Sequence, residues 1–185
     1  MNETLTAKGT YKVVKQQIEN GCDINSINQN GETALHVAIS SRGYYSNQNK
    51  IIIKLLLNKG INVYMQDKNG NTALHLAQIK GRDYDIIDLL INFHDHFNVV
   101  NSFDETPVHI ALRNNDMYII NAMLKKSDDT KHYIDYEANT YLHYIIKENL
   151  NCDFISIFAN KDNVNMKDNY KDLPLNLALK KKDKH

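Results

Sequence analysis

Thr72-Ala73-Leu74-His75 occurs, with small changes, four times along this chain. The other copies are Thr33-Ala34-Leu35-His36, Thr106-Pro107-Val108-His109 and Thr140-Tyr141-Leu142-His143, and an eroded fifth copy stands at Leu173-Pro174-Leu175-Asn176. Successive copies are 39, 34, 34 and 33 residues apart. A period of this length predicts stacked supersecondary units, which build an extended surface more readily than a deep reactive pocket.

The clearest repeat runs from Asp67 to about Val100. Its Asn69-Gly70 pair predicts a tight turn, because both residues readily adopt a positive φ. Thr72 then stands where a helix begins and can cap its free N–H groups, and Gly81 predicts a left-handed end to that helix. A second helix is predicted by the apolar stripe of Ile86, Ile87, Leu89, Leu90 and Ile91.

This order of turn, Thr-Pro-Leu-His phrase, two short helices and outward exit resembles the ankyrin repeat. Exit segments of the family's Gly-Ala-Asp-Val-Asn kind are visible at Gly21-Cys22-Asp23-Ile24-Asn25, Gly60-Ile61-Asn62-Val63 and Asn163-Val164-Asn165. The resemblance implies an all-α ankyrin-repeat solenoid, in which stacked helix-turn-helix units are joined by short β-hairpin-like loops.

We expect one ankyrin-repeat domain over residues 1–185. It comprises a partial repeat at 1–27, repeats at about 28–66, 67–100, 101–134 and 135–167, and a partial repeat at 168–185. The opening repeat supplies mainly a second helix, and the closing repeat stops at Leu179 after one helix. Either the terminal lysines cap the array with polar side chains, or the chain was cut from a longer array.

Composition argues against nucleic acid and membranes as partners. The chain has 22 Lys and Arg against 22 Asp and Glu, so no global field attracts phosphate, and no apolar run approaches the length of a membrane span. Cys22 and Cys152 lie far apart and outside any CxxC pattern, which predicts reduced, partly buried thiols. We expect a monomeric cytoplasmic protein, or one in the host cytoplasm if it comes from an intracellular pathogen.

Four of the eight histidines share one position of the repeat: His36, His75, His109 and His143. The resemblance implies a structural role for them, in which each ring bonds to the neighbouring repeat. Equivalent positions on stacked helices lie about 10 Å apart, too far to share a metal ion whose bonds to nitrogen are about 2 Å. The chain contains no GxSxG, P-loop or HExxH motif. We therefore expect no catalysis, cofactor or metal.

The resemblance also implies where a partner binds, since ankyrin repeats usually contact partners through the hairpin tips and the outward face of the first helix. Three successive tips carry an aromatic residue, a type that dominates interface hot spots together with Arg. Each ring either faces a partner or folds back onto its own hairpin. The candidate partner-binding residues are Lys68, Asn69, Asn71, Ile79, Lys80, Phe103, Glu105, Arg113, Tyr136, Glu137 and Tyr170.

Tyr44 and Tyr45 form a second candidate, because they lie in the insertion that lengthens the first period to 39 residues. Taken together, the sequence predicts a non-catalytic protein–protein interaction module that docks a partner protein on its concave face, centred on Phe103, Arg113 and Tyr136. Two alternatives stay open. The array is the regulatory or targeting part of a larger enzyme or adaptor, or it is a pathogen or viral factor that captures host proteins.

Overall fold

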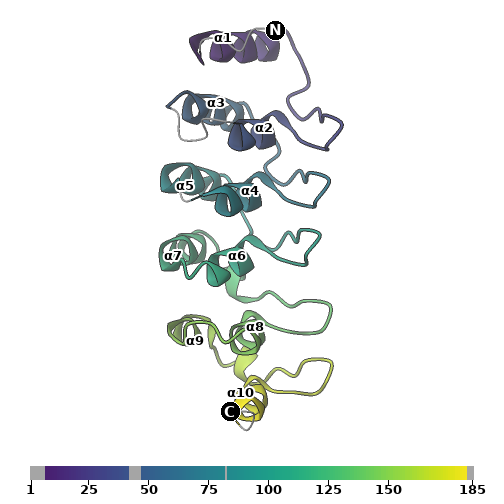
Figure 1. The fold of residues 1–185 in the computed structure, drawn as a ribbon, viewed down its shortest axis with the longest axis vertical. Coiled ribbons are helices and arrows are strands. Elements are labelled where there is room, and N and C mark those ends of the chain that lie inside the picture. The colour runs from purple at the N-terminus through teal and green to yellow at the C-terminus, as the bar shows by residue number, and fades with distance from the viewer. Residues whose placement is uncertain (1–6, 42–46, 82, 183–185) are drawn as a thin grey trace. The chain divides into compact units, whose positions relative to one another are not determined.

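The computed structural model describes residues 7–41, 47–81 and 83–182, which form short α-helices joined by loops (Figure 1). Tyr44 and Tyr45 lie outside these residues. Within them the β-structure is an isolated antiparallel bridge between Ile134 and Thr140. The chain divides into two compact units, Met1–Asp95 with Val99–Pro107 and His96–Asn98 with Val108–His185, named here unit 1 and unit 2.

Unit 1 is built from paired helices. Its helices are α1 (Ala7–Glu19), α2 (Ala34–Ser40), α3 (Asn47–Asn58), α4 (Ala73–Lys80) and α5 (Tyr84–Asn92). α2 pairs with α3 and α4 with α5, while α1 packs against α3 and α2 against α4. The contacts bury Leu35, Ile53 and Leu74 almost completely, so stacking removes from water the apolar faces that a single repeat would expose.

Unit 2 repeats this arrangement with a more aromatic core. It contains α6 (Pro107–Arg113), α7 (Met117–Lys126), α8 (Tyr141–Lys147), α9 (Asp153–Phe158) and α10 (Pro174–Lys182), with 3-10 turns at Asp128–Lys131 and Asn163–Asn165. α8 pairs with α9, and α10 packs against α8. The Tyr141 ring is stacked on Tyr133 at 4.9 Å between centroids and meets Phe158 edge-on at 5.3 Å.

The repeated phrase fixes where the first helices begin. Thr72 is extended (φ −78°, ψ 169°), and its backbone N–H donates to Nδ1 of His75 at 3.2 Å. The backbone N–H of His75 points back at the Thr72 hydroxyl, 3.5 Å away. This is a capping box in which histidine takes the place of Glu or Gln, and it recurs at Thr33 and Thr140.

The end of α4 differs from expectation in one respect. The helix stops at Lys80, and Gly81 follows it as predicted, but with φ 151° and ψ 167°. Gly81 therefore turns the chain in an extended conformation with positive φ, rather than in the left-handed helical one.

Candidate functional site

Each repeated phrase is preceded by a loop that one Asn or Asp side chain holds in shape. In every loop its Oδ1 accepts the backbone N–H groups two and four residues ahead. These Asx bonds fix the loop without help from a β-sheet. The anchoring residues are Asn28, Asp67, Asn101, Asp135 and Asp168.

Sequence reasoning missed these anchors, although the signal was present. An Asn or Asp stands five residues before every Thr of the phrase, and before Leu173 in the eroded copy. The hairpin tips are therefore ordered loops whose backbone is already bonded internally.

Backbone bonds also join successive loops within unit 1. The N–H of Lys68 donates to the carbonyl of Asn30, and that of Ser102 donates to the carbonyl of Asn69, both at 2.9 Å. Lys68 adds a side-chain bond from Nζ to Asn30 Oδ1 at 3.1 Å. The three loops of this unit thus hold one another in register.

The histidine of the phrase links one loop to the next. His36 Nε2 lies 3.0 Å from the carbonyl of Asn71, and His75 Nε2 lies 3.0 Å from that of Glu105. In unit 2, His143 Nε2 lies 3.3 Å from the carbonyl of Asp172. His109 is packed among aromatic rings, with the Tyr144 centroid at 4.5 Å.

The protonation of these rings follows from their bonds. Because Thr72 donates to Nδ1 of His75, the ring proton sits on Nε2 and points at the Glu105 carbonyl. Burial lowers the pKa of His75 to about 4, and burial also lowers the pKa of His36. The two rings are therefore neutral at pH 7. Among the described residues, no group of three or more His, Cys, Asp or Glu side chains is arranged to hold a metal ion.

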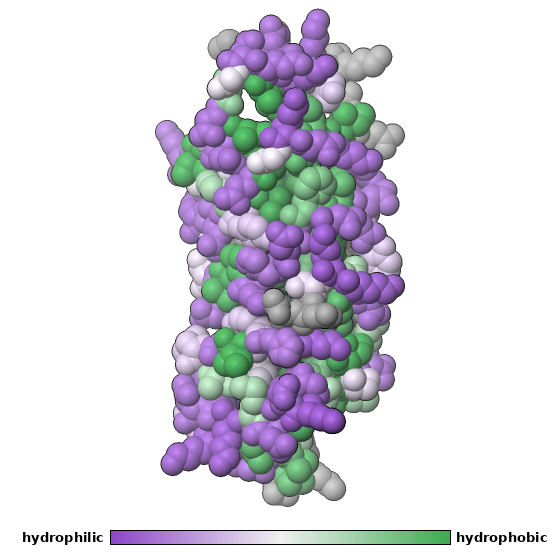
Figure 2. Space-filling model, turned by 180° about the vertical axis from the view of Figure 1, so that it is seen from behind, coloured by the Kyte–Doolittle hydropathy of each residue, from purple (hydrophilic) through white to green (hydrophobic). Residues whose placement is uncertain are grey.

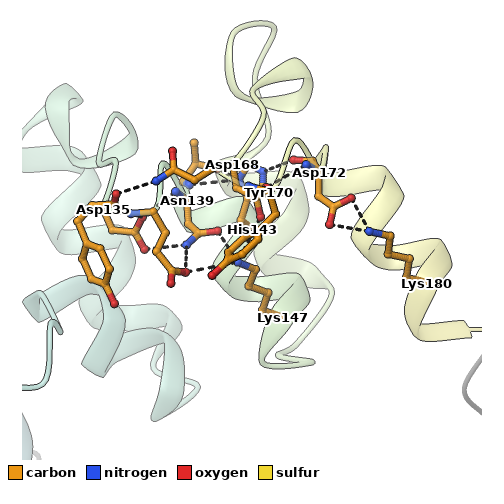
Figure 3. Close-up of polar contacts among 12 residues, drawn as sticks. Asp135, Asn139, His143, Lys147, Asp168, Tyr170, Asp172 and Lys180 are labelled. Atoms are coloured by element: carbon orange, nitrogen blue, oxygen red, sulfur yellow. Dashed lines mark hydrogen bonds and ion pairs between the residues drawn. The ribbon is translucent and has the colours of Figure 1, made fainter.

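In unit 2 a single lysine connects two loops (Figure 3). Lys147, the last residue of α8, places Nζ 2.6 Å from Asn139 Oδ1, 3.3 Å from Asp168 Oδ2 and 3.9 Å from Glu137 Oε2. Nζ also lies 5.8 Å from the centre of the Tyr170 ring, within cation–π range. Lys147 thus links the loop at 135–139 to the loop at 168–172.

Asp168 is the buried end of this network. Burial favours its neutral form, but the backbone N–H of Asp172 and the Lys147 ammonium outweigh that effect, so the pKa of Asp168 is below its usual range. The backbone N–H of Asn169 donates to the carbonyl of Glu137 at 2.8 Å, and its side chain donates to the carbonyl of Tyr136 at 3.0 Å. A pocket of about 190 Å³ opens beside the first loop, between Glu137 and Glu148.

The structure exposes the three tip aromatics. Phe103 is 76% exposed, Tyr136 75% and Tyr170 70%, so the rings project into solvent, with Tyr170 also contacting Lys147. Unit 1 brings Phe103 onto a loop beside Lys68 and Asn69, and unit 2 brings Tyr136, Glu137 and Tyr170 together. Also on the surface are Ile79, Lys80 and Arg113, while Glu105 and Glu137 are half-buried.

Two expectations need correction. Asn71, one of the predicted tip contacts, is buried, and its Oδ1 accepts a hydrogen bond from Asn101 Nδ2 at 3.1 Å. Its side chain therefore joins two loops and is not displayed to a partner. Cys22 and Cys152 are free thiols, but both are exposed and not partly buried.

In the view of Figure 2 most of the visible surface is hydrophilic, and the hydrophobic side chains gather in several groups. Of the helices that the structure describes, none is both long and apolar enough to cross a membrane.

The paired helices and cross-bonded loops define a helical repeat protein. The chain belongs to the ankyrin-repeat family: the family model described as "Ankyrin repeats (3 copies)" matches residues 4–97 and 79–168. The predicted all-α architecture is confirmed, and the helix pairs are consistent with an ankyrin-repeat solenoid.

Solved structures agree on the fold. The chain is similar to a chain of the complex between the Bd0816 predatory endopeptidase from Bdellovibrio bacteriovorus and the immunity protein Bd3460. The identity is 19% and the TM-score 0.64, and the match covers 100% of this chain and 95% of the other. No curated protein matches significantly.

Proposed function

We propose that this chain is a non-catalytic protein–protein interaction module that binds a partner protein through its hairpin tips and first helices. The observation that carries the proposal is the display of Phe103, Tyr136 and Tyr170, three mostly exposed rings on loops that are already ordered. Aromatic side chains give a large contact area at a low cost in side-chain entropy, and a loop that is ordered before binding loses little further freedom.

Two comparisons support a protein as the partner. Ankyrin repeats are a protein-binding module, and the similar solved chain comes from a complex of an endopeptidase with an immunity protein. The partner's identity is not carried over from that complex, because the likeness is one of fold.

Each unit offers its own contact surface. In unit 1 the surface combines Phe103 and Glu105 with the polar tip of Lys68 and Asn69, and with Ile79 and Lys80 at the end of α4. In unit 2 it combines Tyr136, Glu137 and Tyr170, and Arg113 at the end of α6 is a separate candidate. Asn71 is left out because it is buried.

The test is affinity capture with the immobilised full chain, with bound proteins quantified by mass spectrometry. Phe103→Ala and Tyr136→Ala should each reduce the retention of the specific partner by about tenfold or more, while the melting temperature stays within a few degrees because both rings are exposed.

The matched controls are Phe93→Ala in unit 1 and Tyr118→Ala in unit 2, which remove exposed rings outside the loops. They should bind as the unmodified chain does. If the two loop variants retain the partner as well as the controls, binding does not use the tips, and the proposal fails.

A further inference from the structure

The pocket beside the loop at 135–139 is a small, partly open cavity within unit 2. Its volume is about 190 Å³, and its lining includes Glu137 and Asn139 of the loop, Tyr144 of α8, and Glu148, which directly follows that helix. An engineered protein cavity of about 150 Å³ holds a benzene molecule. The pocket is therefore large enough to hold one planar side-chain group of a partner.

The charge of this lining is negative. It contains the carboxylates of Asp135, Glu137 and Glu148 but only one ammonium group, that of Lys147. The Lys147 ammonium is already paired with Asp168, whose Oδ2 lies 3.3 Å away and whose side chain is 1% exposed. Because Asp168 offsets the charge of Lys147, the three carboxylates of the lining are not balanced by it. The field inside the pocket therefore favours a cation.

Hydrogen bonds hold the loop side of the pocket in place. Asn139 Nδ2 donates to Asp135 Oδ2 at 2.9 Å and to Glu137 Oε2 at 3.2 Å. The Oδ1 atom of the same amide accepts from Lys147 Nζ at 2.6 Å (Figure 3). These bonds engage only one carboxylate oxygen of Glu137. Its carboxylate is thus oriented before a ligand arrives, and its Oε1 atom remains available as an acceptor.

Glu148 is placed where it does not favour folding. It is the C-cap of α8, and its backbone N–H donates to the carbonyl of Tyr144 at 2.9 Å. Its side chain is exposed and makes no hydrogen bond or ion pair with the residues that the structure describes. A carboxylate at this end of a helix lies at the negative end of the helix dipole, and Glu137 adds a second negative charge across the pocket. A cation bound in the pocket would relieve both repulsions.

We propose that this pocket takes an arginine side chain of the protein partner. The inference rests on the proposed function, because it names what the partner presents to the surface of unit 2. A guanidinium group has a planar fork of N–H donors that matches carboxylates such as those of Glu137 and Glu148. It also stacks on aromatic rings, and Tyr144 supplies a ring in the wall of the pocket. The exposed rings of Tyr136 and Tyr170 are then left for the residues on either side of the arginine.

The first measurement is an NMR titration of the isotope-labelled full chain at neutral pH with N-acetyl-arginine amide. The matched probe is N-acetyl-citrulline amide, which has nearly the same shape but no charge. The arginine amide should shift the backbone amides of Asn139, Tyr144 and Glu148 with a Kd of about 1–10 mM, a weak affinity suited to a single side chain. The citrulline amide should bind at least about tenfold more weakly. Equal binding of the two probes, or shifts confined to other parts of the chain, would overturn the proposal.

Glu148→Gln tests the pocket itself, since it removes one charge and keeps the shape of the side chain. It should weaken binding of the arginine amide by about tenfold. Its melting temperature should equal or exceed that of the unmodified chain, because the change breaks no described bond and removes a repulsion. Asp162→Asn is the matched control, an exposed carboxylate of unit 2 outside the lining, and it should bind as the unmodified chain does. Unchanged binding in Glu148→Gln, a lower melting temperature, or an equal loss in the control would refute the arginine pocket.

The partner retained in the affinity capture separates this inference from the proposed function. Glu148→Gln should reduce the retention of that partner by about tenfold, as Tyr136→Ala does, while Asp162→Asn leaves it unchanged. If Tyr136→Ala loses the partner and Glu148→Gln keeps it, the proposed function stands and the arginine pocket is refuted. If the tip variants Phe103→Ala and Tyr136→Ala keep the partner, the proposed function fails, whatever the titration with the arginine amide gives.

Discussion

Unit 1 and unit 2 build the same loop with different residues at its tightest point. Three residues after each anchoring Asn or Asp, φ is positive in all five loops. In unit 1 these positions are Gly31, Gly70 and Asp104 (φ 58°), so two of three are glycine, whereas in unit 2 they are Ala138 (φ 62°) and Lys171 (φ 65°). A side chain at positive φ is strained where glycine is not.

The glycines of unit 1 also allow the backbone of the next loop to approach closely. A Cβ on Gly70 would lie 2.7 Å from the backbone nitrogen of Ser102, and one on Gly31 would lie 3.1 Å from that of Lys68. Unit 2 forms the equivalent bond, from Asn169 to Glu137, beside an alanine. It adds the side-chain bond from Asn169 to Tyr136 and the ion pair of Lys147 with Asp168. Because the turn has the same shape with glycine or with a side chain at this position, we infer that the Asx anchor sets its shape. Contacts between neighbouring loops then offset the backbone strain of a side chain at positive φ.

Gly70→Ala should cause the largest loss, about 3–4 kcal/mol in the free energy of unfolding. It combines left-handed strain of about 1–2 kcal/mol with an overlap against backbone that the Ser102–Asn69 bond holds in place. Urea unfolding measures the change in the free energy of unfolding, and hydrogen exchange of the backbone amides in α4 shows whether the loss is local to this repeat.

Gly60→Ala is the matched control, because Gly60 has φ 79° but open space around its would-be Cβ. It should lose only the strain, about 1–2 kcal/mol. Equal losses of stability in Gly70→Ala and Gly60→Ala would mean that the loop at Gly70 can move aside for a Cβ. Glycine would then not be needed in unit 1 for the close approach of the next loop.

Acid should weaken unit 1 through His75. Its folded pKa of about 4 lies below the ordinary value of 6.5, so the unfolded chain binds more protons between these pH values. The stabilisation is complete above pH 6.5 and falls by about 3 kcal/mol as the pH drops toward 4. Protonation of Nδ1 would also end its acceptance of the Thr72 N–H.

The measurement is urea unfolding at a series of pH values for the chain and for His75→Asn, the residue found at this position in the last copy of the phrase (Asn176). The variant is expected to be less stable at pH 7 and to lose less stability on acidification. Parallel pH profiles would show that His75 is not the titrating group.

The helices could be predicted from the sequence because their signals are local and repeated. Thr72 and His75 lie about one helical turn apart, and the same pair recurs after 39, 34 and 34 residues. The role of Thr72 as a cap follows from its place before the helix, whereas the role of His75 as a link between repeats was implied by the resemblance to the ankyrin repeat.

The orientation of the tip residues could not be predicted in the same way. Asn69 and Asn71 are two residues apart in one loop, yet Asn69 is exposed and Asn71 is buried. What turns Asn71 inward is a hydrogen bond from Asn101, 30 residues away. Likewise, the sequence predicts Lys147 to be a surface residue at the end of a helix, whereas the structure places Asp168 beside it. Such contacts depend on where the neighbouring loop lies, which local chemistry does not specify.

A buried glutamine gives a second contrast between the units. Gln78 lies six residues after Thr72 and is buried with both amide atoms unbonded, whereas Leu112 lies six residues after Thr106 and is buried in unit 2. Because an unbonded buried amide costs free energy, Gln78→Leu should stabilise unit 1 by about 1–2 kcal/mol. Urea unfolding measures the gain, and Gln78→Glu, which buries a charge, should instead destabilise. A neutral or unfavourable leucine would mean that the amide is satisfied by water.

Ala138→Gly should give the smallest effect, a gain of up to about 1 kcal/mol in the stability of unit 2. Removing the Cβ relieves the strain of φ 62°, but the freer glycine adds entropy to the unfolded chain and cancels part of the gain. Ala159→Gly is the control, because Ala159 has φ −66° and gains nothing from glycine, so it should lose stability. Thermal unfolding separates the two by the sign of the shift. If both variants lose stability equally, the alanine in the unit 2 loop is unstrained, and glycine in unit 1 is needed only for the close approach of the next loop.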